Sequence, residues 1–181
     1  RRQRQMCIRD RNSCHMHLQN IYEAGKPFER LIDHPSWIDH ITRYVGGDDG
    51  LFIDEAFLIS QGLGPGQQFH SGGHKRKIRT QFRFHNNEFR CGQVNILLAL
   101  TDIGPGDGPT MVIPGSHKSN FEHPDLKKVA MRSEGFGELI EGAIEIQMAA
   151  GDVLVFVDGL CHGSAKRNKS CLLYTSPSPR D

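Results

Sequence analysis

The chain has 181 residues, of which 24% are charged and 37% hydrophobic, and its formal net charge is +1 at pH 7. This near-neutral balance argues against binding of nucleic acid through a polybasic face. No apolar run is long enough for a membrane span or a signal peptide. We therefore expect a soluble protein of one domain, whose partner is a small molecule rather than nucleic acid or a membrane.

The two ends of the chain resemble translated sequencing adapter. Codons for residues 6–10 have a reverse complement that encodes residues 171–175 in a shifted frame. We expect residues 1–11 and 170–181 to be adapter-derived and residues 12–169 to form one domain that is incomplete at both ends. Residues 1–10 and 171–181 carry five Lys or Arg and two Asp or Glu, so their removal changes the net charge to about −2. The alternative is a basic arm and a disordered Ser-Pro tail.

Three cysteines remain in this domain, Cys14, Cys91 and Cys161. They are odd in number and form no Cys-x-x-Cys pair, so neither a disulfide framework nor a zinc site is expected. Reduced thiols are typical of a cytoplasmic protein.

Helix signals come first along the chain. Residues 27–44 carry apolar side chains at helical spacing, with Pro35 as a first-turn proline. We expect two short helices joined at Asp33 and His34. Strands follow, indicated by short apolar or alternating runs between Gly, Pro and Asp, at residues 51–58, 79–85, 94–100, 111–113, 143–148 and 153–157. In the run at 79–85, Thr80, Phe82 and Phe84 should form a buried face. Residues 119–142 are expected to be helical or irregular.

This pattern favours a mainly β fold with a helical lead-in. Many short strands between turn residues are typical of a double-stranded β-helix, the jelly-roll or cupin-like barrel, here truncated. Three motifs make the assignment more specific: Gly-Asp-Gly-Pro-Thr-Met-Val-Ile-Pro-Gly-Ser-His-Lys at 106–118, Gly-Asp-Val-Leu-Val-Phe at 151–156 and Cys-His-Gly-Ser at 161–164. In this order they resemble the phytanoyl-CoA dioxygenase family of iron(II)- and 2-oxoglutarate-dependent oxygenases.

The resemblance implies Fe(II) held by two histidines and a carboxylate, with 2-oxoglutarate as co-substrate. The second family histidine corresponds to His162, and Ser164 corresponds to a hydroxyl that binds a carboxylate of 2-oxoglutarate. Gln93 and Asn95, which alternate on one predicted strand, could present polar groups to the same cavity, or could be satisfied amides of a packed strand. The implied reaction is hydroxylation of a small organic substrate, coupled to decarboxylation of 2-oxoglutarate.

The first family histidine is harder to assign, because the usual His-x-Asp or His-x-Glu is missing. His70, in His-Ser-Gly, is the preferred metal ligand, with His74 and His85 as alternatives. The literal His-x-Asp at residues 123–125 follows the Pro-Gly-Ser-His loop and is interpreted as a helix start or turn.

A missing carboxylate leaves three readings open. Asp54 or Glu55 could supply it, a chloride ion could fill the position as in the halogenating relatives, or the barrel could be an inactive binding module.

The family also places an arginine about eleven residues after the second histidine, which falls within residues 170–181 here. We therefore expect the chain itself to bind 2-oxoglutarate weakly. A basic run with Arg76, Arg79, Arg83 and Arg90 could meet an anionic substrate, although a solvated face is the preferred interpretation.

Overall fold

The computed structural model describes residues 16–46, 50–130 and 139–169. The expected adapter-derived ends at 1–11 and 170–181 lie outside the described residues. The described chain is mainly β, and all of its strand pairs are antiparallel. Its strands are β1 (Met16–Gln19), β2 (Phe57–Ser60), β3 (Phe82–His85), β4 (Glu88–Cys91), β5 (Val94–Leu98), β6 (Thr110–Val112), β7 (Ile144–Ile146), β8 (Val153–Val157) and β9 (His162–Ser164).

The helices are short. They are α1 (Lys26–Glu29), α2 (Ile38–Tyr44) and α3 (Pro124–Ala130), with single 3-10 turns at Ile21–Ala24, Gly73–Lys75 and Ser116–Lys118. The two-helix lead-in is present, but both helices are shorter than expected, and Pro35 precedes α2 instead of opening its first turn. The turn at His123 leads into α3 as expected, since the His123 ring accepts a hydrogen bond from the Asp125 amide. No described helix has the length and apolar character needed to cross a bilayer.

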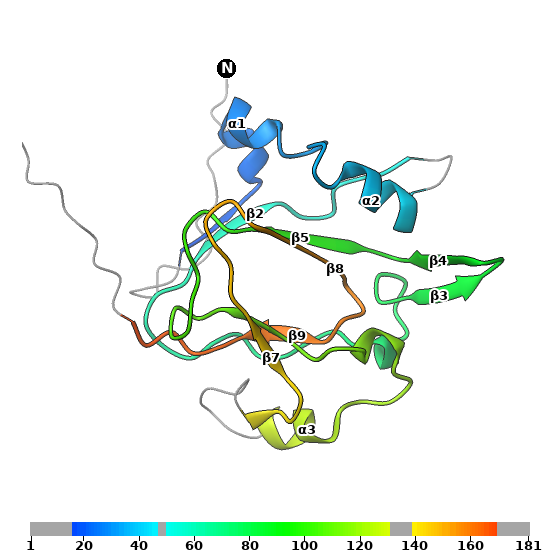
Figure 1. The fold of residues 1–181 in the computed structure, drawn as a ribbon, viewed down its shortest axis with the longest axis vertical. Coiled ribbons are helices and arrows are strands. Elements are labelled where there is room, and N and C mark those ends of the chain that lie inside the picture. The colour runs from blue at the N-terminus through cyan, green and yellow to red at the C-terminus, as the bar shows by residue number, and fades with distance from the viewer. Residues whose placement is uncertain (1–15, 47–49, 131–138, 170–181) are drawn as a thin grey trace, which may run out of the picture.

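Two sheets face each other across the domain (Figure 1). One is the β5–β8 pair, and the other has the strand order β7-β6-β9. Helices α1 and α2 lie outside the β5–β8 pair, α3 lies beyond the second sheet, and the β3–β4 hairpin extends at one end (Figure 1). This is the two-sheet arrangement that a jelly roll requires.

The core follows the central strand of the second sheet. Met111, Val112 and Ile113 are consecutive and all buried, as expected for a strand covered on both faces. Ile113 packs with Ile140 and Cys161, together with the half-buried residues Phe69, Leu126 and Ala143. The strand that carries the Pro-Gly-Ser-His motif is therefore anchored on both sides.

Two strand predictions need correction. Residues 51–56 form no strand; β2 begins only at Phe57, where it finds its partner β1, and Phe52 is 88% exposed. The predicted buried face at 79–85 is confirmed for Thr80, which is 2% exposed, and Phe82 is half-buried, but the prediction is wrong for Phe84, which is 61% exposed. Among the described strands, β3 and β4 pair only with each other, and the Phe84 ring contacts that of Phe89 within the hairpin at 4.8 Å between centroids. Alternation of residue types indicated the strand correctly but not what covers it.

Candidate metal centre

His70 and His162 lie directly opposite each other in an antiparallel bridge. The backbone N–H of His70 donates to the carbonyl oxygen of His162 at 2.9 Å, and the N–H of His162 donates to the carbonyl of His70 at 3.2 Å. Residues that exchange both hydrogen bonds place their side chains on the same face of the sheet. The two imidazole ring centroids are accordingly 4.1 Å apart.

This pairing belongs to a longer contact in which residues 64–70 run beside β9. Gly64 forms a bridge with Arg167, and the amide of Ser164 donates to the carbonyl of Gln67 at 3.2 Å. At Gly66 a Cβ atom would overlap the carbonyl oxygen of Ser164, so only glycine permits this approach. This glycine-containing segment therefore serves as an additional, irregular strand that carries His70.

Both rings present the same nitrogen to the open side of the site. Nδ1 of His162 lies 2.7 Å from the carbonyl oxygen of Leu160, and Nδ1 of His70 lies 3.0 Å from that of Gln68. A carbonyl oxygen only accepts, so each Nδ1 carries a proton, and in the neutral form of such a ring Nε2 has the lone pair. Histidines that bind metals are commonly oriented in this way, with the second ring nitrogen donating to a carbonyl.

Burial keeps the His162 ring neutral. It lowers the pKa of His162 below 6.5, and the adjacent His70 lowers it further, against the opposing effect of the Leu160 carbonyl. A neutral imidazole is the form that binds a metal ion. The donor set therefore suits a metal with two imidazole ligands.

A carboxylate ligand is missing at the position after Ser71. Gly72 has φ of 99°, and a Cβ atom there would lie 2.7 Å from Nδ1 and Cε1 of the His74 ring. Within the described ranges, no three His, Cys, Asp or Glu side chains form a group that could hold a metal ion. The acids considered as distant substitutes, Asp54 and Glu55, are exposed in the irregular segment before β2. Among the described residues, His70 and His162 thus pair without a third such side chain beside them.

The alternatives to His70 lie elsewhere. His74 lines a pocket of about 270 Å³ with Cys161, and its Nε2 is 4.0 Å from Glu122. Neighbouring residues of an extended chain point to opposite faces, so the Cys161 side is not the His162 side. His85 ends β3 opposite Glu88 and is exposed. Of the three candidates, His70 is the one whose ring contacts that of His162.

The residues expected to bind 2-oxoglutarate lie in two parts of the fold, Ser164 in β9 and Gln93 and Asn95 around the start of β5. Ser164 lies two residues after His162 in β9 and therefore on the same face, and its Oγ accepts a hydrogen bond from the amide of Gln67 at 2.7 Å. The hydroxyl hydrogen stays free to donate. Asn95, in contrast, is engaged by the protein: its Oδ1 accepts from Gln93 and its Nδ2 donates to Asp158, both at 3.3 Å. Gln93 and Asn95 are therefore linked to the site through Asp158.

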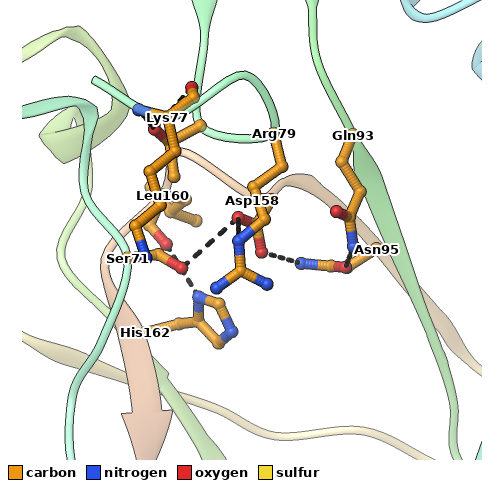
Figure 2. Close-up of polar contacts among 9 residues, drawn as sticks. Ser71, Lys77, Arg79, Gln93, Asn95, Asp158, Leu160 and His162 are labelled. Atoms are coloured by element: carbon orange, nitrogen blue, oxygen red, sulfur yellow. Dashed lines mark hydrogen bonds and ion pairs between the residues drawn. The ribbon is translucent and has the colours of Figure 1, made fainter. Parts of the chain in front are cut away.

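Asp158 is a site residue that the sequence did not reveal. It is 4% exposed and follows β8, where its amide donates to the carbonyl of Gln93 at 2.9 Å. Its carboxylate accepts from Asn95, lies 3.5 Å from Oγ of Ser71, and forms an ion pair with Nε of Arg79 at 3.4 Å. Figure 2 shows the Arg79 guanidinium between Asp158 and His162. The sequence signal that could have indicated Asp158 is the Asp158-Gly159 pair directly after the apolar run at 153–157, but such a pair also marks ordinary turns.

The chain is similar in sequence to known dioxygenases. The family model described as phytanoyl-CoA dioxygenase (PhyH) matches residues 12–171. The chain is 25% identical over 156 residues to Dioxygenase cdmD of Talaromyces verruculosus, with 83% of this chain and 46% of that protein covered. It is 28% identical over 134 residues to Dioxygenase FUM3 of Gibberella moniliformis, with 71% and 39% covered. The chain thus spans less than half the length of either relative.

Among solved structures, HygX from Streptomyces hygroscopicus with nickel and 2-oxoglutarate bound superimposes with a TM-score of 0.75 at 22% identity, over 89% of this chain and 67% of that one. A further HygX structure contains nickel, 2-oxoglutarate and hygromycin B, and superimposes with a TM-score of 0.73 at 21% identity, over 87% and 66%. This likeness confirms the expected jelly-roll fold. Since the family match covers most of the chain, the chain belongs to the phytanoyl-CoA dioxygenase family.

Proposed function

We propose that the protein is an iron(II)- and 2-oxoglutarate-dependent dioxygenase that hydroxylates a small organic substrate. The observation that carries this proposal is the pairing of His70 with His162, whose rings lie 4.1 Å apart with each Nδ1 turned to a backbone carbonyl. Membership of the family and the metal-bound HygX structures support it. Two of the three protein ligands of the usual non-haem iron site are thereby accounted for.

His70 and His162 would hold the metal through Nε2, and Ser164 would donate to a carboxylate of 2-oxoglutarate. When bound, iron(II) would supply the activation of dioxygen, which is coupled to the decarboxylation of 2-oxoglutarate. The protein's own contribution is orientation. The carbonyls of Gln68 and Leu160 fix the two rings, and the Gln67 amide fixes Oγ of Ser164.

Gly72 favours halogenation as a second candidate. It stands where the family has a carboxylate ligand, and the described residues supply no other acid to complete the ligand set. A coordination position without a protein ligand is open to a halide. The His74 ring beside Gly72 restricts the protein's side of that space, so the occupant would have to be small.

We further propose a cytoplasmic location and no nucleic-acid or membrane partner. The two described cysteines, Cys91 and Cys161, are free and buried, which suits a reducing compartment. The near-neutral composition offers no polybasic surface of the kind that nucleic acid requires.

The test is anaerobic titration of the full chain with Fe(II), followed by 2-oxoglutarate, with the visible charge-transfer band as readout. We expect a band in the wild type and none in His70→Ala or His162→Ala. The matched control is His85→Ala, which removes an exposed imidazole from the β3–β4 hairpin and should retain the band.

The outcomes separate the candidate functions. A band that shifts on addition of chloride favours halogenation, and one that is indifferent to chloride favours hydroxylation. If iron does not bind to the folded wild-type chain, the protein is a jelly-roll binding module and the dioxygenase proposal fails.

A further inference from the structure

The backbone around Arg79 is closely enclosed by two glycines from other parts of the chain. It forms a turn between these two glycines. A Cβ atom at Gly92 would overlap the carbonyl oxygen of Ile78 and come within 2.9 Å of Cα of Arg79. A Cβ atom at Gly159 would lie 2.7 Å from the carbonyl oxygen of Thr80. Real Cβ atoms do not approach so closely, so any residue other than glycine at position 92 or 159 would displace this turn.

Thr80 closes the turn from inside. Only 2% of it is exposed, and its Oγ1 lies 3.1 Å from both the amide and the carbonyl oxygen of Lys77. The amide of Gly92 donates to the carbonyl of Gln81 at 3.0 Å and ties the turn to β4. The Cα of Arg79 is therefore fixed relative to both β4 and the turn after β8.

The side chain of Arg79 is oriented through its Nε atom. Its Nε forms the ion pair with Asp158, whose carboxylate is also satisfied by Asn95 and Ser71. Within the described chain, neither Nη atom of Arg79 has a hydrogen-bond or ion-pair partner, and 49% of the side chain is exposed. Figure 2 shows this free end of the guanidinium directed toward His162. An arginine that needed only to neutralise Asp158 would have no reason to present its two-pronged end to the site.

Arg79 and Ser164 belong to different segments of the chain near His162. Asp158, which anchors Arg79, precedes His162 by four residues, whereas Ser164 follows it by two within β9. A co-substrate held by Ser164 therefore leaves Arg79 available for a second molecule. The preceding residues Lys75, Arg76 and Lys77 are exposed or half-exposed cations of the same loop, which makes the approach to the site positively charged.

We propose that Arg79 binds the carboxylate of an anionic organic substrate beside the His70–His162 pair. This assignment rests on the proposed function and adds the substrate class. The two Nη atoms form the fork that matches a carboxylate in bidentate fashion, and Asp158 is the positioning residue that sets the fork.

The experiment compares benzoate with benzamide, its neutral isostere, as probes. Binding to the full chain without metal is followed by saturation-transfer NMR and by the ring resonances of labelled histidine. We expect benzoate to bind at least about tenfold more tightly than benzamide and to shift the His162 resonances. This preference should disappear in Arg79→Met and be reduced in Arg79→Lys, which keeps the charge but not the fork.

The matched control is Arg83→Met, which removes the same charge from the exposed strand β3. Equal loss of benzoate binding in both variants would mean that general basic charge attracts the probe, and the proposal would be wrong. Asp158→Asn should weaken benzoate binding without abolishing it.

Titration of the iron-loaded protein with 2-oxoglutarate distinguishes the two carboxylate sources. If Arg79→Met raises the Kd of 2-oxoglutarate about as much as that of benzoate, Arg79 holds the co-substrate and the substrate proposal falls. Binding of benzoate to the metal-free protein is measured independently of the charge-transfer band of the iron-loaded protein. Absence of the band would therefore overturn the proposed function, while the NMR comparison would still decide the role of Arg79 in anion binding.

Discussion

The imidazole of His74 lies over Gly72, so that a Cβ atom on Gly72 would come within 2.7 Å of Nδ1 and Cε1 of that ring. Nε2 of His74 is itself buried without a hydrogen-bond partner. A side chain on residue 72 is thus disfavoured in two ways, by the neighbouring ring and by a φ of 99° that side chains rarely adopt.

Restoring the acid at this position should therefore fail in a single step. We expect Gly72→Asp to lower the free energy of unfolding by about 1–3 kcal/mol, the range for a strained backbone position, with a further loss from displacement of His74. The double variant with His74→Ala should recover only the part due to the ring. Urea denaturation measures both. Gly104→Ala, whose Cβ meets nothing closer than 3.6 Å, is the control. A Gly72→Asp protein as stable as the wild type would contradict this account.

Gly66 should control the distance between the two histidines without being a ligand. A Cβ atom there would overlap the carbonyl oxygen of Ser164, so Gly66→Ala must push residues 64–70 away from β9. Since His70 lies on this segment, we expect the Fe(II) affinity to fall by about tenfold or more, as for loss of well-placed supporting contacts. Isothermal titration with Fe(II) is the measurement, again with Gly104→Ala for comparison. Unchanged affinity would show that the pairing of His70 with His162 does not depend on the approach at Gly66.

Stability should decrease as the pH falls below about 6.5. Burial lowers the pKa of His117 below its value of 6.5, and the pKa of His74 and of His162 shifts in the same direction for the same reason. The unfolded chain then takes up protons that the folded chain refuses, so the stabilising contribution is present above pH 6.5 and is lost toward the lower folded pKa. Urea denaturation of the metal-free protein between pH 7.5 and 5.5 should show this loss.

His117 offers a clean check, because it is not among the proposed ligands. Its ring packs edge-on against Phe82 with centroids 4.6 Å apart, and its Nδ1 is buried without a partner. His117→Gln should make the stability less sensitive to pH over this range, with His85→Gln on the exposed hairpin as the control. An unaltered pH dependence in His117→Gln would place the effect elsewhere.

Cys161 should be unreactive in the folded protein. It is 2% exposed, and burial raises the pKa of its thiol to about 11, so almost no thiolate exists at pH 8. Iodoacetamide at pH 8 should leave the peptide containing Cys161 unmodified until urea unfolds the chain, as judged by mass spectrometry. The adjacent pocket, which Cys161 lines, makes this a real test. Rapid labelling without denaturant would mean that the thiol is both accessible and ionised.

Much of the β framework could be predicted from residue order. The apolar run at 153–157 is β8 to the residue, and the runs around Val94, Met111 and Ile144 each contain a strand. Short apolar segments between turn residues specify strands because their burial needs no distant information. The same local signal misled at residues 51–56, which pair with no strand of the described chain, and at Phe84, which is 61% exposed.

The sequence by itself determined the family, the position of His162 and the absence of a His-x-Asp pair before the strand at Val94, since each is a matter of residue identity and order. Only the tertiary structure shows that His70, and not His74 or His85, lies opposite His162, because this depends on which segment pairs with β9, and register is a long-range property. It likewise singled out Arg79 from its basic run. The contacts that distinguish it, with Gly92, Gly159 and Asp158, join residues that are far apart in the chain and close only after folding.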